Sequence, residues 1–459
     1  MRRAVLYFLK LGILVAIAVW IANRPGTVRL EWQGYVVETP LGVAALALLA
    51  LLVSAAWLYR FWRALLHAPT ALGRYRGEGR RVKGYRALTQ GMVAVAAGDA
   101  RTAERCARKA EELLDEPPLT LLLSAQAAQL GGDETAAAGY FEAMLQRPET
   151  EFLGLRGLLI QALKRGDLKR GLELAQRARG LEPKAGWPIV TLMELEARQG
   201  AFAAAEDALD RAQSVKALDP ELARRHRATL LTERARAAGE AGRLEEAVTL
   251  AQKAHDLLPS FVPAAVELAR HKAKAGNVKA ARKALEQAWR ANHHPDLADA
   301  WGEIEAGTHP LDLVKRFEAL VEIDPDSTEA QMALGRACIH ARLWGQARAA
   351  LERARAKAPT PRLYLLLAEL EEAEHGDGPG VRQWLAKIAG APADDTWVCS
   401  ECGGPATAWS AVCGHCHAFD RLEWRTPGLP PLPAPAPLPA TVPAPVPAAR
   451  TLSQARPGG

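Results

Sequence analysis

The chain has 459 residues, of which 49% are hydrophobic and 24% charged, values that are ordinary for a globular protein of two or three domains. Its six cysteines form no pattern of a disulfide framework. Much of its formal net charge of +6 lies in one short stretch beside a predicted membrane segment, which favours an anionic lipid surface over nucleic acid as the partner. Alanine and leucine dominate, and both favour helix.

Two apolar segments near the N-terminus are long enough to cross a membrane. Residues 4–22 contain one charge, Lys10, and residues 41–59 contain none. A span requires about 20 apolar residues, so the sequence predicts a transmembrane hairpin over residues 1–62. The alternatives are a cleaved signal peptide for the first segment and a buried core helix for the second. No A-x-A cleavage site follows the first, which argues against a signal peptide.

Basic residues set the expected orientation of this hairpin. A basic segment at 63–89 follows the second span and contains one acid, Glu78, whereas arginines and glutamates are balanced in the 24–40 loop. Since basic residues accumulate on the cytoplasmic side, both ends of the chain are expected in the cytoplasm. The hairpin is therefore expected to cross the membrane twice.

An internal period begins after this segment. Glycines recur at intervals of 34, 34, 34, 42 and 34 residues: Gly98, Gly132, Gly166, Gly200, Gly242 and Gly276. A small residue lies five positions after each glycine, and alanine lies twelve positions after five of the six. The same offsets recur from Arg342, whereas the pattern degrades between 290 and 325. This spacing is typical of stacked helix pairs joined by sharp turns.

The period of 34 resembles the tetratricopeptide repeat, and it predicts an all-α solenoid over residues 90–390. A generic helical bundle is the alternative, but it does not explain four identical intervals. Helical repeats of this kind bind proteins in a groove, so protein partners are expected and no enzymatic activity is.

Histidines in the repeats form no cluster in the sequence. They are scattered, and His293-His294-Pro295 is the one pair. This pair is interpreted as a polar turn between helices, with a metal or haem contact as the alternative. Cys106 and Cys338 stand alone in helical sequence and are interpreted as small buried hydrophobic residues.

A four-cysteine module is predicted at residues 397–424. Its metal ligands would be two C-x-x-C pairs: Cys399, Cys402, Cys413 and Cys416. Two such turns place four thiolates around one ion, as in structural zinc sites. Gly403 and Gly414 suit the turns, and Trp397, Trp409, Phe419 and Trp424 are expected to pack around the site.

Zinc is the expected metal, with iron as the alternative. A redox dithiol would need one C-x-x-C alone, so the second pair argues against it. The last segment, 426–459, contains eleven prolines from 427 onward and is expected to be disordered.

The N-terminal part resembles the HemY family of inner-membrane proteins. The resemblance rests on the loop VRLEWQGYVVET at 28–39 and the basic segment that ends in GMVAVAAGD at 91–99. It implies a location in the bacterial inner membrane and a scaffold or regulator associated with haem biosynthesis, with pathway enzymes as partners and haem binding as an alternative. The flavin-dependent protoporphyrinogen oxidase of the same name is excluded, because GEGRRV at 77–82 is no dinucleotide fingerprint.

The four-cysteine module is similar to the rubredoxin-like C-terminal domain of LapB, another membrane-anchored repeat protein. That resemblance implies a second hypothesis, an adaptor for a membrane protease or a lipopolysaccharide enzyme. LapB has a single anchor, whereas two spans are predicted here.

Overall fold

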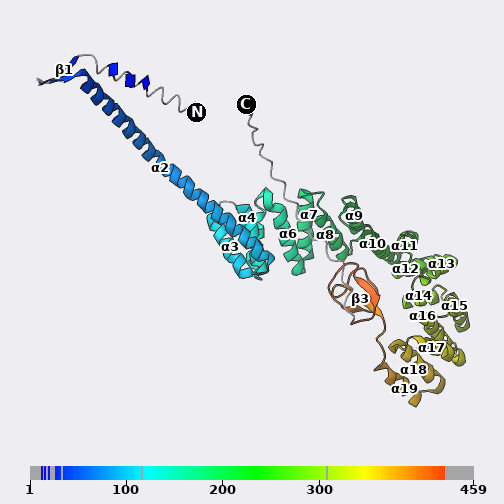
Figure 1. Ribbon diagram of the computed structural model, residues 1–459. Helices are drawn as coiled ribbons and strands as arrows, with labels where there is room; N and C mark the ends of the chain where they lie inside the picture. The colour runs from blue at the N-terminus through cyan, green and yellow to red at the C-terminus, as the bar shows by residue number, and fades with distance from the viewer. Residues whose placement is uncertain are drawn as a thin grey trace, which may run out of the picture. The chain divides into compact units, whose positions relative to one another are not determined.

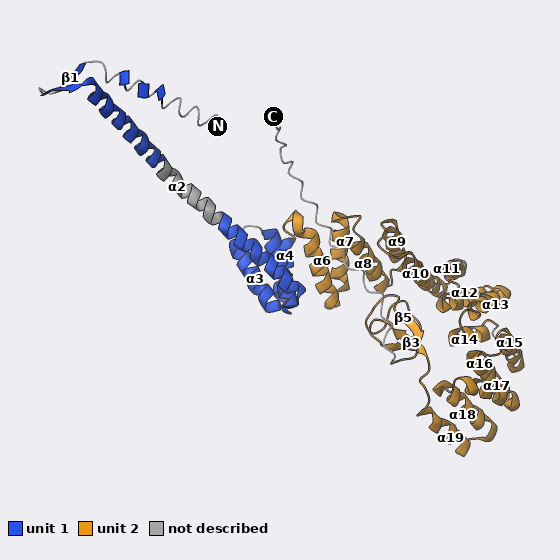
Figure 2. Ribbon diagram, viewed as in Figure 1, with its two compact units in different colours: residues 1–144 blue, residues 145–459 orange. Residues whose placement is uncertain are grey.

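A computed structural model describes residues 12–13, 15–16, 19–20, 26–32, 35–114, 117–305 and 309–428, except for the side chains at 32, 35 and 64–77. The described chain divides into two compact units, residues 1–144 and 145–459 (Figure 2). Most of the first predicted span, 4–22, and the tail at 429–459 lie outside the described residues.

The first unit begins with a hairpin of two antiparallel strands, β1 (Thr27–Trp32) and β2 (Tyr35–Pro40). Arg29 lies opposite Glu38 in the register, and its Nε is 3.2 Å from that carboxylate. The backbone N–H of Leu41 donates to the carbonyl of Gly26 at 2.8 Å, which ties the base of the hairpin to the helix that follows. The hairpin was not predicted from the sequence.

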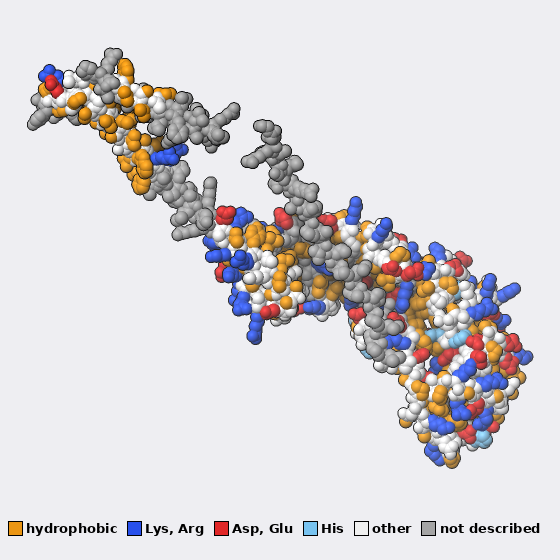
Figure 3. Space-filling model, in the orientation of Figure 1, with side chains coloured by type: hydrophobic (Ala, Val, Ile, Leu, Met, Phe, Trp, Pro, Cys, Tyr) orange, Lys and Arg blue, Asp and Glu red, His pale blue; other side chains and the backbone are white. Residues whose placement is uncertain are grey.

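A single helix, α2 (Leu41–Ala96), follows the hairpin. Within the described residues, Leu41–Arg63 is the one helical stretch long and apolar enough to cross a membrane. Its side chains are exposed, and hydrophobic side chains cover this part of the helix in Figure 3. The helix continues through the predicted basic segment and into the first repeat, so none of these three parts is separated from the next by a break in helix α2.

Within each unit the helices form antiparallel pairs that stack along the chain, and α3 pairs with the end of α2 (Figure 1). In the first unit these are α3 (Ala100–Leu113), α4 (Pro117–Leu130) and α5 (Glu134–Met144). The second unit holds α6 (Pro148–Lys164), α7 (Leu168–Leu181), α8 (Gly186–Arg198), α9 (Phe202–Ser214), α10 (Pro220–Glu240), α11 (Leu244–Leu257), α12 (Val262–Lys274) and α13 (Val278–Trp289). It continues with α14 (Pro295–Glu303), α15 (Pro310–Ile323), α16 (Thr328–His340), α17 (Trp344–Lys357), α18 (Pro361–His375) and α19 (Pro379–Ile388).

The glycine register confirms the predicted repeat. All six glycines have a φ between 75° and 79°, a conformation that only glycine adopts at little cost. The residues five and twelve positions later are buried, because both helices of a pair meet at these small side chains. Arg342, the expected equivalent in a later repeat, has a φ of 57° and so keeps the same turn without a glycine.

Two irregularities interrupt the array. Helix α10 has 21 residues, whereas α8, α12 and α16 have 13 each, and this accounts for the interval of 42. Where the pattern degrades, α14 and α15 still form a pair: the indole of Trp301 donates to the carbonyl of Arg316 at 2.9 Å.

Residues 396–425 form a small antiparallel sheet in the order β4-β3-β5, with β3 (Thr396–Cys399) between β4 (Pro405–Ala406) and β5 (Leu422–Arg425). This module lies on the inner side of the curve that α8 to α18 describe (Figure 1). One hydrophobic core joins its Trp397, Cys399 and Phe419 to Met193 and Leu230 of the repeats. The module therefore shares a core with the array.

Candidate metal centre

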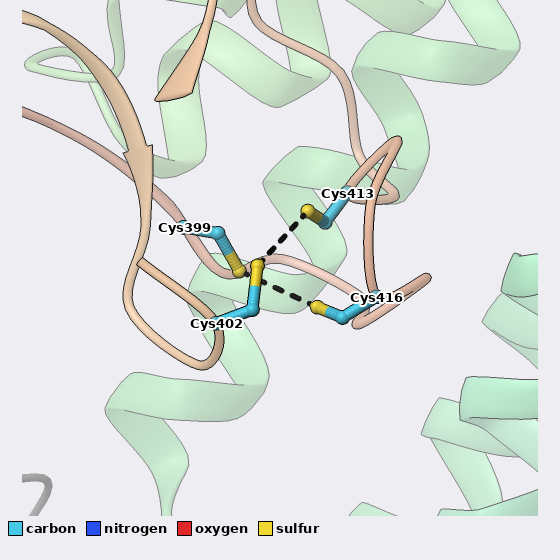
Figure 4. Close-up of side chains that lie close together, drawn as sticks. All are labelled: Cys399, Cys402, Cys413 and Cys416. Atoms are coloured by element: carbon cyan, nitrogen blue, oxygen red, sulfur yellow. Dashed lines mark hydrogen bonds between the residues drawn. The ribbon is translucent and has the colours of Figure 1, made fainter. Parts of the chain in front are cut away.

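The four predicted metal ligands lie together. The Sγ atoms of Cys399, Cys402, Cys413 and Cys416 lie within 4.8 Å of one another and point toward a common centre (Figure 4). Cys399 Sγ is 3.7 Å from Cys416 Sγ, and Cys402 Sγ is 3.8 Å from Cys413 Sγ. A tetrahedron with metal–sulfur bonds of about 2.3 Å has edges of about 3.8 Å, so the sulfurs are spaced to hold one ion.

Each C-x-x-C turn aims a backbone donor at its sulfur. The N–H of Gly404 donates to Cys402 Sγ, and the N–H of His415 donates to Cys413 Sγ, both at 3.4 Å. Gly403 has a φ of 71°, as its role in the first turn requires. In the second turn the equivalent residue is His417, with a φ of 57°, and Gly414 lies within that turn.

The thiols cannot all ionise easily without a cation. Burial raises the pKa of Cys416 to about 12, and it also raises the pKa of Cys399. At Cys413 burial acts in the same direction, but N–H donors from Cys416 and His415 outweigh it and lower the pKa to about 7. A bound dication would stabilise all four thiolates, and this donor set fits a structural metal with no open coordination position.

The carboxylate of Asp420 fixes one end of the module to α10. Its side chain is 1% exposed, with Oδ2 2.7 Å from His226 Nδ1. Oδ1 accepts from Thr229 Oγ1 at 3.0 Å and from Arg225 Nε at 3.3 Å. A buried carboxylate is tolerated where its oxygens are paired in this way.

A second contact lies one helical turn further along α10. Glu233 accepts from the backbone N–H of Ala411 at 2.9 Å and from the guanidinium of Arg236. Trp409 packs edge-on against Phe261 with ring centroids 5.4 Å apart, and the Arg236 guanidinium lies 5.5 Å from the Trp409 ring. The loop between the two C-x-x-C pairs is therefore held by α10 and by the residue that precedes α12.

His294 forms the third contact. Its ring centroid lies 4.0 Å from that of Trp424 and 5.1 Å from that of Trp397. Its Nδ1 accepts from the N–H of Asp296 and so caps α14. Burial, followed by the nearby Arg362 guanidinium, lowers the pKa of His294 to about 3, so the ring is neutral between the two indoles.

Sequence reasoning missed these anchoring residues. The histidines that it left without partners include His226 and His294, which both hold the module. The four aromatic side chains expected around the metal also pack against the repeats. One signal was available: Arg225 and His226 lie on the extra length of α10, and the interval of 42 records that insertion.

Two cavities lie between the module and the first helices of the later pairs. One, of about 200 Å³, lies between Trp409 and α12 and α14. The other, of about 380 Å³, lies between the opposite edge of the module and α14, α16 and α18. Neither is lined by a histidine among the described residues.

Family models match two parts of the chain. Residues 26–132 match the HemY protein N-terminus, and residues 240–302 and 314–370 match the tetratricopeptide repeat. The chain carries a HemY N-terminal domain. The HemY domain covers the hairpin, α2 and the first repeat, and the apolar part of α2 lies within it, so the chain is a membrane-associated HemY-like repeat protein.

Known relatives of this HemY-like chain match different shares of its length. A probable magnetosome protein, Mms48, of Magnetospirillum gryphiswaldense is 26% identical over 92% of this chain and 93% of its own length. The HemY protein of Escherichia coli K12 is 30% identical over 145 residues, which are 31% of this chain and 36% of that protein. The chain thus spans about a third of that HemY protein's length.

Solved structures of repeat proteins are also similar to it. A tetratricopeptide repeat protein of Parabacteroides merdae aligns over 52% of this chain and 93% of its own, at 17% identity and a TM-score of 0.29. The MamA protein aligns over 43% of this chain and 100% of its own, at 16% identity and the same TM-score. Tetratricopeptide repeats are generally scaffolds without catalytic activity.

Proposed function

We propose that this chain is a membrane-anchored scaffold that binds a protein partner in the groove of its repeats. The observation that carries this proposal is the cavity of about 380 Å³ along α14, α16 and α18, on the face that the module leaves open. Because the apolar stretch of α2 continues as one helix into the repeats, the scaffold would hold its partner at the membrane.

The HemY N-terminal domain supports a partner in haem biosynthesis, since that pathway is associated with the family. The partner class would be enzymes of porphyrin synthesis, positioned by the groove. The Mms48 relative, a probable magnetosome protein, matches nearly the whole chain, so we propose that the two proteins share one architecture.

A second candidate is an adaptor of the LapB kind, for a membrane protease or an envelope enzyme. The four-cysteine module favours it, because that module is the feature shared with LapB. Direct haem binding has less support: His226 is bound to Asp420, and His294 is enclosed by two indoles.

Two further parts of the proposal concern the anchor and the metal. We propose a two-pass anchor with both ends of the chain in the cytoplasm, on the basis of the basic residues that flank the spans. We propose zinc at the four cysteines, because the sulfur spacing suits its tetrahedral geometry. Iron in the same site would absorb visible light, and metal analysis of the purified protein separates the two.

Affinity purification from native membranes after crosslinking tests the function. Late porphyrin enzymes should be recovered with the full-length chain. They should be lost with a variant that carries Leu365→Glu in the groove and be retained with Leu311→Glu on α15. Recovery of a protease or lipopolysaccharide enzymes would favour the adaptor, and recovery of no protein would refute the scaffold.

A further inference from the structure

The groove beside the module has a repeating surface. Helix α16 contributes Glu329, Met332, Ala333 and Arg336 to the larger cavity, and α18 contributes Arg362, Leu365, Leu366 and Glu369. These positions are spaced i, i+3, i+4 and i+7, which is one face of each helix. Each set has two apolar residues between two charged ones, so an apolar strip crosses both helices between charged borders.

One apolar side chain in this strip lacks cover. Leu365 is 51% exposed, although Met332 and Ala333 on the preceding first helix are buried. The module closes one side of the cavity with Thr396, Thr407 and Trp424, together with the preceding Asp395. The result is an apolar groove that has a wall on one side and an exposed leucine in its floor.

The charges around this groove are not balanced. Five carboxylates and two guanidinium groups line it, an excess of three negative charges. Arg336 pairs with Asp299, and Arg362 pairs with Glu329. Within the described residues, no lysine or arginine lies at ion-pair distance from the remaining three carboxylates, Asp296, Glu369 and Asp395, and a histidine, His294, lies 3.7 Å from Asp296.

His294 does not neutralise Asp296. Its Nδ1 accepts the N–H of Asp296 and therefore carries no proton. Asp395 accepts from the hydroxyl of Thr426 at 2.6 Å, which leaves its charge in place. The smaller cavity shares Asp296 and Asp299, and its two further carboxylates, Glu267 and Glu303, pair with Arg236 and Arg270 of the same lining.

We propose that this groove is where the partner docks, and that it takes a segment with apolar side chains flanked by lysine or arginine. The apolar residues would cover Leu365 and Trp424, and the basic residues would pair with Glu369, Asp395 and Asp296. Opposite charges across an interface raise the association rate and specificity. This inference rests on the proposed scaffold function and adds the site and the chemistry of the partner segment.

Peptide binding tests the chemistry, with the full-length chain in phosphatidylcholine nanodiscs and empty nanodiscs as the blank. The probes are fluorescein-labelled peptides of twelve residues: alternating leucine and lysine, the same with glutamate for lysine, and the same with serine for leucine. We expect the leucine–lysine peptide to bind at least about tenfold more tightly than either of the others.

Two variants locate that binding. Glu369→Lys with Asp395→Lys should weaken the leucine–lysine peptide by about tenfold or more, since it removes two of the carboxylates and adds two cations. Glu286→Lys, on α13 away from the groove, should leave the affinity unchanged. Equal binding of the lysine and glutamate peptides, or equal effects of the two variants, would overturn the proposal.

A photocrosslinking residue separates this proposal from the scaffold function. Placed at Leu365 in native membranes, it should capture the partner found by affinity purification, through a segment rich in apolar and basic residues. Placed at Leu311, which is 44% exposed on α15, it should not. A partner that is purified but never captured at Leu365 would leave the scaffold function standing and refute this site, whereas the absence of any partner refutes both.

Discussion

Asp420 combines a buried charge with a backbone conformation that non-glycine residues rarely adopt. Its φ is 53°, and its carboxylate contacts Arg225, His226 and Thr229 on α10. Aspartate enters the left-handed region more readily than most residues, at a cost of about 1 kcal/mol, and the contacts to α10 offset that cost. The position of the module therefore depends strongly on this one side chain.

Replacing the charge at Asp420 tests that dependence. Asp420→Asn keeps the size but loses the ionic contacts, and it should weaken module docking by about 2 kcal/mol, the range for hydrogen bonds to charged groups. Limited proteolysis of the 389–395 linker should become faster while metal content stays the same. Asp377→Asn, on an exposed turn, is the matched control. Unchanged proteolysis would mean that this cluster does not hold the module.

His294 makes module docking dependent on pH. The pKa of His294 is about 3 in the folded chain, whereas the ordinary value for a histidine is 6.5. Between these two values only the undocked or unfolded state therefore gains a proton. Stability should therefore fall as pH decreases from 6.5 towards 3. Between pH 7 and pH 5 the loss should be about 2 kcal/mol.

The variant His294→Asn isolates this effect, because asparagine can still cap α14. His255 and His271 also have pKa values lowered by burial, whereas burial raises the pKa of Asp296 and of Glu329. These groups remain in both proteins. Thermal unfolding from pH 7 to pH 5 should show a smaller decline for the variant, and parallel curves would exclude His294 as the cause.

Loss of one cysteine ligand should unfold the module without unfolding the repeats. Cys399→Ser removes one ligand, so the protein should lose its metal and the 397–424 module should unfold, while the repeats stay folded. Cys106→Ser is the control, since Cys106 lies alone on α3. A Cys399→Ser protein that keeps one equivalent of metal and native protease resistance would contradict the site.

At the scale of elements, the turns between paired helices follow one backbone rule. Gly242 and Arg342 occupy the same position of the turn, with φ values of 76° and 57°. No atom lies within 4 Å of the position where a Cβ on Gly242 would be, so a side chain there would meet only backbone strain. The cost of that strain should be about 1 kcal/mol.

Substitutions at these two turns measure how much the left-handed backbone conformation costs. Gly242→Ala should lower the free energy of unfolding by about 1 kcal/mol, and Arg342→Gly should not lower it, because relief of strain offsets the added freedom of the unfolded chain. Chemical denaturation of both variants provides the test. Equal destabilisation by the two changes would show that the turn conformation is not the determinant.

The regular elements were predictable because their causes are local. A glycine at each turn and small residues five and twelve positions later specify a helix pair without reference to the rest of the chain. The four cysteines were equally predictable from spacing. The β1–β2 hairpin was missed because its sequence was interpreted only as a loop between spans, and the continuity of α2 was missed because composition changes along it without a helix breaker at 63 or 89.

The docking of the module was not predictable in this way. The hydrogen bonds between the module and α10 join residues 178 to 195 positions apart, as in Ala411 to Glu233 and Arg225 to Asp420. No periodicity relates such residues, and histidine, threonine and glutamate on a helix are usually solvated. In the sequence, only the extra length of α10 indicated where the module docks. The structure shows that this extra length carries contacts to the module.

At the scale of the whole molecule, the module changes what the repeats can bind. It covers the inner face from α8 to α14 and leaves the acidic, partly apolar groove along α14, α16 and α18. A metal ion would therefore affect the shape of the groove, because folding of the module around the metal completes one wall of the groove.

We infer that a metal-held module lies in the groove of the repeats. Hydrogen–deuterium exchange of the full-length protein, before and after removal of the metal by a chelator, tests it most directly. We predict that chelation increases exchange both in residues 396–425 and in their contact face on α10 and α12, with no change in α3. Increased exchange in the module alone, with α10 and α12 unaffected, would contradict the docked arrangement.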